Sequence, residues 1–133
     1  MSKIIYMDDI YKMIELLPDE KQNATTDEGE CIYTNIDGDH CIAGEIIRML
    51  GFNLPDVEDY DNRLPVRTFV ESRYPDKFDD NAIEMLFVGQ STADRLTHSE
   101  DRLAWCFAKR DMMNFFNRTR KEEIAQRKLQ VGE

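Results

Sequence analysis

Apolar residues near the amino terminus recur every three or four positions, which is the spacing of one face of an α-helix. Between residues 6 and 17 this stripe consists of Tyr6, Ile10, Met13, Ile14 and Leu17. Pro18 follows directly, and proline does not continue a helix because it lacks a backbone N–H group. The sequence therefore predicts a first helix over residues 6–17.

The next segment, residues 18–30, contains one alanine and no larger apolar residue. A segment with nothing to bury cannot anchor itself to a core, so we expect a long polar linker that only a partner would order.

A hairpin pattern follows, with β-branched and aromatic residues on both sides of the Asp-Gly dipeptide at 37–38. Asp-Gly favours the positive φ angles of a tight turn, so we predict short strands over residues 31–36 and 39–42. The pattern fits a loop of two or of three residues, and only the longer loop puts Cys31 and Cys41 on one face.

Four more apolar stripes, with helix-terminal residues at their ends, predict further helices. Gly51 is placed to end one of them with a left-handed cap, and Pro75 stops the next. Asn81 with Glu84 forms a capping-box pattern at the start of a third. The predicted ranges are 42–50, 64–74 and 81–93, and the last helix begins near Leu103 after a break around residues 96–98.

The fold class predicted from these elements is α+β: a mainly helical single domain of about five helices with one short β-hairpin. The globular domain is expected to cover residues 1–116. Residues 117–133 hold five basic and three acidic residues, so we predict a charged helical extension or tail.

The composition narrows the range of partners. The chain has 133 residues, with 17 Lys and Arg against 27 Asp and Glu, and its net charge is −10. Such a molecule repels nucleic acid, so we expect no direct nucleic-acid partner. It has no run of about 20 apolar residues and no signal-peptide pattern, so we expect no membrane partner and a cytoplasmic location. Three cysteines, an odd number, indicate free thiols.

Catalytic chemistry finds little support in the sequence. His40 adjoins Cys41, which raises the hypothesis of a thiol-dependent enzyme using Cys41 or Cys31. Consecutive side chains of a strand point to opposite faces, however, so packing of Cys41 in the core is the favoured interpretation. We predict no catalytic residues and no enzyme activity.

A metal site is also disfavoured. Asn35, Asp37 and Asp39 alternate as in a calcium loop, but His40 and Ile46 stand where such a loop needs glycine and glutamate. We therefore predict no metal ligands and no cofactor.

The acidic residues are the feature that departs most from an ordinary sequence. Four carboxylates surround an aromatic residue in one short stretch, and these five residues form the predicted partner-binding site: Asp56, Glu58, Asp59, Tyr60 and Asp61. More carboxylates follow at Asp76, Asp79 and Asp80. They would suit a partner with a basic surface, although the same residues are expected where charge only maintains solubility.

Two short blocks of the sequence resemble a known family. They consist of Cys31-x-Tyr33 with Cys41-Ile42-x-Gly44 and Leu50-Gly51, and of Ala82, Leu86, Gln90 and Asp94 with Trp105-x-x-Ala108. This pattern resembles a family of small uncharacterised proteins from bacteriophages and actinobacteria. The resemblance implies a phage or bacterial origin and lends no activity.

Charge and resemblance together lead to one favoured hypothesis. We expect a non-enzymatic, phage-type protein in the cytoplasm of a bacterial host. It would inhibit a host-defence system, such as a CRISPR effector, by covering the basic nucleic-acid-binding surface of a host protein. Such an anti-CRISPR protein would act through protein–protein interaction.

The alternatives are a nucleotide-signal binder and the thiol enzyme already described. A nucleotide site would draw on Arg48, Arg63 and Arg67, the nearest basic cluster in the sequence. The chain is compatible with a monomer or with a dimer formed through the C-terminal helix. Phe115 or Phe116 is a candidate exposed anchor for such contacts, although burial of both is favoured.

Overall fold

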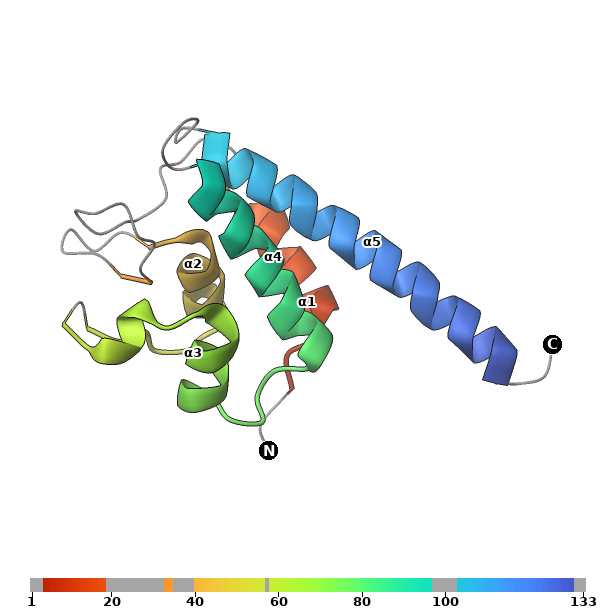
Figure 1. The fold of residues 1–133 in the computed structure, drawn as a ribbon, viewed down its shortest axis with the longest axis horizontal. Coiled ribbons are helices and arrows are strands. Elements are labelled where there is room, and N and C mark those ends of the chain that lie inside the picture. The colour runs from red at the N-terminus through yellow and green to blue at the C-terminus, as the bar shows by residue number, and fades with distance from the viewer. Residues whose placement is uncertain (1–3, 19–32, 35–39, 57, 97–102, 131–133) are drawn as a thin grey trace.

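The structure is a computed structural model that describes residues 4–18, 33–34, 40–56, 58–96 and 103–130 (Figure 1). In this part the chain forms five α-helices and one short 3-10 helix. The elements are α1 (Met7–Leu16), α2 (Ile42–Met49), η1 (Tyr60–Arg63), α3 (Val66–Arg73), α4 (Asp80–Leu96) and α5 (Ala104–Gln130).

Helices α4 and α5 pack side by side and run in opposite directions, with α1 against both and α2 and α3 against α4 (Figure 1). Gly89 allows the close approach of α4 to α5, because a Cβ atom added there would overlap Sδ of Met112. The largest fully buried side chains come from all five helices: Trp105, Phe69, Ile10, Ile14, Ile42, Ile46, Ile47, Met85, Leu86 and Met112. One core therefore joins the five helices.

The α+β prediction is wrong, because the described residues form no strand. Ile42 begins α2 instead of ending a strand, and Cys41 is the N-cap residue, whose Sγ accepts a hydrogen bond from the Gly44 N–H at 3.4 Å. The predicted turn at 37–38 lies outside the described residues, as do residues 19–30 of the predicted linker.

Residues 33 and 34 show in part why the hairpin prediction is wrong, because their hydrogen-bond partners are Asn62 of η1 and Leu64 instead of a second strand. The N–H of Thr34 donates to Oδ1 of Asn62 at 3.0 Å, and Nδ2 of Asn62 donates to the carbonyl oxygen of Thr34 at 2.8 Å. The aromatic side chain of Tyr33 is buried, so it packs in the core without pairing to a second strand. In the described residues β-type pairing is limited to one isolated parallel bridge between Ile5 and Phe78.

Tyr33 links α2 to α3. Its ring stacks on Phe69 with centroids 3.8 Å apart, and its hydroxyl donates to the carbonyl oxygen of Leu64 at 2.6 Å. A Cβ atom added at Gly44 would lie 2.6 Å from the carbonyl oxygen of Tyr33, so this backbone rests directly on α2. The contact requires glycine at position 44.

Each predicted helix has a counterpart in the structure. Gly51 has a φ of 100°, the left-handed conformation expected of a residue that ends a helix. Pro75 lies just beyond α3, which ends at Arg73. The predicted helix over 81–93 is longer in the structure, and residues 97–98 of the predicted break lie outside the described part.

Helix α5 has 27 residues, and its carboxyl end extends past the rest of the molecule (Figure 1). Trp105 is fully buried, and Phe115 and Phe116 are both half-buried against the core. From Asn117 onward most side chains are exposed, although Arg120 forms an ion pair with Asp8 of α1.

Among the helices of the described part, none combines the length and the hydropathy needed to cross a membrane.

Candidate functional site

The predicted acidic site forms the loop that leads into η1. Asp56 and Glu58 are exposed there, and neither forms an ion pair with a described residue. Asp59 caps η1 through Oδ1, which accepts a hydrogen bond from the Asp61 N–H at 2.9 Å. Tyr60 begins η1, and its side chain lies outside what the structure describes. Among the described residues the site thus divides into two carboxylates without an ion-pair partner and a capped turn.

Arg73 of α3 binds two of the predicted carboxylates. Its Nη1 lies 3.2 Å from Oδ2 of Asp59 and 3.3 Å from Oδ2 of Asp61. Burial acts to lower the pKa of Arg73, but its interactions, led by the hydrogen bond to Asp61, outweigh burial and raise the pKa above its ordinary value. Arg73 therefore stays charged and fixes the acidic loop to α3.

A second group of carboxylates lies beside α3 and at the start of α4. Arg67 of α3 lies 2.9 Å from a carboxylate oxygen of Glu84, 3.4 Å from Asp80 and 3.5 Å from Glu71. The hydrogen bond to Glu84 is the largest influence raising the pKa of Arg67. The side chain of Asp80 is 89% exposed, so this ion pair leaves most of the carboxylate in solvent.

These elements together form what we call the acidic surface, residues 53–84. They hold nine Asp and Glu against four Lys and Arg, a net charge of −5 out of −10 for the chain. In Figure 1, η1 and α3 lie at the other end of the molecule from the carboxyl end of α5. The α4 end of the acidic surface does contact α5, because Nδ2 of Asn81 donates to Oε1 of Glu123 at 3.5 Å. The sequence showed most of these carboxylates, but it did not show that Arg67 and Arg73 bind them.

The residues of the thiol hypothesis have separate partners. Cys41 is fully buried and accepts the Gly44 N–H. Nδ1 of His40 lies 2.9 Å from the carbonyl oxygen of Tyr33 and 3.3 Å from Oγ1 of Thr34. Cys31 lies outside the described residues.

The residues of the calcium-loop hypothesis, Asn35, Asp37 and Asp39, also lie outside the described part. Among the residues that the structure does describe, no three His, Cys, Asp or Glu side chains are grouped closely enough to hold a metal ion.

The arginines of the nucleotide hypothesis are engaged elsewhere. Arg48 pairs with Glu45 at 2.6 Å, and Arg67 belongs to the acidic surface. The side chain of Arg63 is not described. The two arginines whose side chains are described thus neutralise carboxylates of their own chain.

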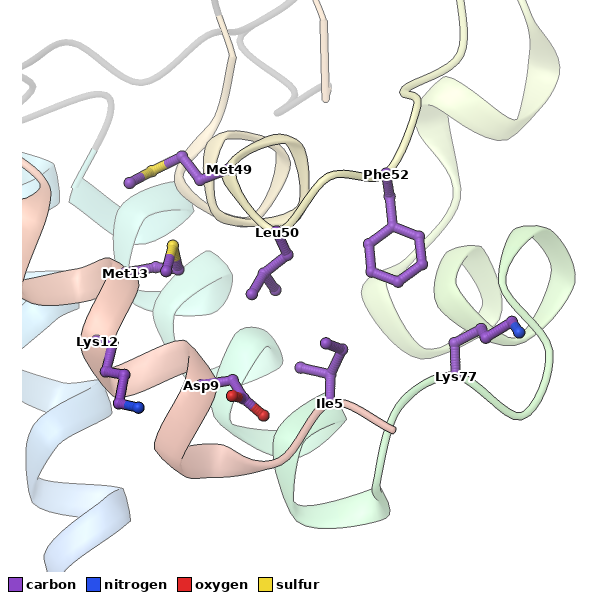
Figure 2. Close-up of a pocket in the computed structure, with 8 residues that line it drawn as sticks. All are labelled: Ile5, Asp9, Lys12, Met13, Met49, Leu50, Phe52 and Lys77. Atoms are coloured by element: carbon purple, nitrogen blue, oxygen red, sulfur yellow. The ribbon is translucent and has the colours of Figure 1, made fainter. Parts of the chain in front are cut away.

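The structure contains a groove that sequence reasoning missed, between α1, the end of α2 and the segment before α4 (Figure 2). Its volume is about 530 Å³. Five apolar and three charged residues line it: Ile5, Met13, Met49, Leu50 and Phe52 with Asp9, Lys12 and Lys77. These residues come from three segments far apart in the sequence, so no local pattern marks the site.

Comparisons with protein-family models, with curated proteins and with solved structures found no match for this chain.

Proposed function

We propose that this protein is a non-enzymatic binding protein whose acidic surface docks onto a basic surface of another protein. The observation that carries this proposal is the concentration of charge: residues 53–84 hold nine carboxylates against four basic residues. A field of one sign attracts an oppositely charged surface and speeds the encounter between the two.

The ion pairs of α3 support a role in binding over a role in solubility alone. Arg73 and Arg67 lie within 3.4 Å of four of the carboxylates, so these charges have a defined arrangement in the structure. A preformed arrangement loses less conformational entropy on association than mobile side chains do. Asp56 and Glu58 are exposed and have no ion-pair partner among the described residues, so their charges are available to a partner protein.

In its narrower form, the proposal identifies the partner as a nucleic-acid-binding protein of a bacterial host, such as a defence nuclease. A regular array of carboxylates can occupy a groove that otherwise accepts phosphates. The phage-like sequence blocks support this setting. Duplex DNA should then compete with the protein for the same partner.

The experiment is capture of bacterial proteins on the immobilised chain, compared between two double variants of equal charge. Asp56→Asn with Glu58→Gln removes two charges from the acidic surface. Glu15→Gln with Glu122→Gln removes two exposed charges elsewhere. We expect the first variant to retain several-fold less of the specific partner than the control at about 0.05 M salt, where charges are weakly screened.

Two results would overturn the proposal. Equal retention by the two variants would mean that the acidic surface is not the docking site. Retention of the partner by the wild type that stays constant up to about 0.5 M salt would mean that charge does not drive the association.

A further inference from the structure

The groove at the end of α2 has the chemistry of a binding site for a small amphiphile, and it uses residues separate from the proposed docking carboxylates. Its volume is about 530 Å³. That size is typical of small-molecule sites. In Figure 2 the side chains of Leu50, Phe52 and Ile5 point into one shared apolar space. Such a space favours an apolar chain over a nucleotide or a sugar.

Two methionines give this groove an adaptable wall. Met13 of α1 and Met49 of α2 lie along one side of it (Figure 2). Methionine has an unbranched, polarisable side chain that fits ligands of varied shape. This wall suits a flexible hydrocarbon chain.

The charged residues of the groove favour an anion. Lys12 and Lys77 stand at its two ends, and neither has a carboxylate partner among the described residues. Asp9 is the acidic residue in the lining, and its Oδ2 already accepts a hydrogen bond from the Tyr6 N–H at 2.9 Å. The carboxylate of nearby Asp79 accepts the Asn81 N–H at 3.1 Å. The lining thus carries a net positive charge in a protein of net charge −10.

We infer that the groove binds a fatty-acid carboxylate, with the hydrocarbon chain over the apolar lining and the carboxylate at one of the two lysines. A lysine ammonium can swing over an apolar surface on its aliphatic stem, so either lysine reaches a head group that leaves the groove. Of residues 53–84 the groove uses Lys77 and none of the carboxylates, and the binding needs no partner protein.

The test uses decanoate below its micelle-forming concentration, with decanol and decyltrimethylammonium as neutral and cationic probes of the same chain length. Titrations are followed by the NMR signals of the methionine ε-methyl groups. The signals of Met13 and Met49 should shift and saturate with decanoate, whereas that of Met112, which is fully buried in the core, should not. Decanoate should bind more tightly than decanol, and the cationic probe least.

Charge variants then test the head-group contact. Lys12→Gln with Lys77→Gln should weaken decanoate binding by about three- to tenfold and leave decanol binding unchanged. Lys121→Gln with Lys128→Gln makes the same charge change at exposed positions of α5 and should leave both affinities unchanged. All four lysines are exposed or half-buried, so both double variants should fold like the wild type. A difference in affinity between them then reports on the head-group contact.

Three outcomes would overturn the inference. The first is decanol or the cationic probe binding as tightly as decanoate. The second is an equal loss of decanoate affinity in the two lysine variants. The third is saturation with decanoate that leaves the signals of Met13 and Met49 in place.

Discussion

Replacement of Gly44 by alanine should destabilise the fold, although alanine is the better helix former. The perturbation adds one methyl group to the first turn of α2. Its carbon would lie 2.6 Å from the carbonyl oxygen of Tyr33 and 3.1 Å from the Cα atom of that residue. Both neighbours are backbone atoms, so the clash cannot be relieved by rotation of a side chain.

The magnitude follows from what must move. To restore an ordinary contact of 3.4 Å the Tyr33 backbone has to shift by about 0.8 Å. That shift disturbs the stack on Phe69 and the hydrogen bond to Leu64, each worth about 1 kcal/mol. Alanine also stabilises a helix by up to about 1 kcal/mol relative to glycine, which offsets part of this loss. With about 1 kcal/mol of overpacking added, Gly44→Ala should lower the free energy of unfolding by about 1–2 kcal/mol.

The assay is urea and thermal unfolding followed by circular dichroism of the helices. A loss of that size corresponds to a decrease in Tm of about 4–8 °C for a chain of this length. In a double-mutant cycle with Tyr33→Ala, the Gly44→Ala change should cost less, because the stack and hydrogen bond are already gone. A Gly44→Ala protein as stable as the wild type would refute the packing of residue 33 on α2.

Three further predictions concern single residues. Asn62→Ala should lower the free energy of unfolding, measured in urea, by about 2–3 kcal/mol. The side chain of Asn62 is fully buried, and its removal takes away the hydrogen bonds of both the N–H and the carbonyl oxygen of Thr34. An unfolding free energy equal to that of the wild type would contradict it. Burial raises the pKa of the Tyr74 hydroxyl in the folded protein. The neutral hydroxyl therefore contributes its full stability below about pH 10, the ordinary pKa of tyrosine, and this contribution is lost as pH rises through the raised folded-state pKa. Tyr74→Phe should flatten that part of the stability profile, and an unchanged profile would refute the assignment. Gly89→Ala should cost less than Gly44→Ala in the same unfolding assay, because the side chain of Met112 can move where backbone cannot; the reverse order would count against this reasoning.

Helices were the predictable part of the fold because their signals are local. The apolar stripe from Tyr6 to Leu17, the cap at Gly51 and the stop at Pro75 each depend on neighbours within a few residues. The hairpin prediction was wrong because it also used local signals alone. Its pattern is local too, but the backbone of Thr34 pairs with Asn62, 28 residues away, and no local pattern reports that partner.

The candidate sites show the same difference between local and long-range information. Carboxylates concentrated between residues 56 and 61 are visible in the sequence, whereas their pairing with Arg73 depends on how α3 packs against the loop. The groove could not be predicted at all, because its lining joins residues 5–13, residues 49–52 and Lys77. Sites built from distant segments require the fold before they can be recognised.

The most direct test of the proposed function is the equilibrium affinity for the captured partner as a function of salt concentration, in the wild type and in the chain lacking the Asp56 and Glu58 charges. If docking depends on the acidic surface, wild-type affinity decreases steeply as salt rises, and the variant binds more weakly with a shallower dependence. Identical affinities and identical slopes for the two proteins would contradict the account.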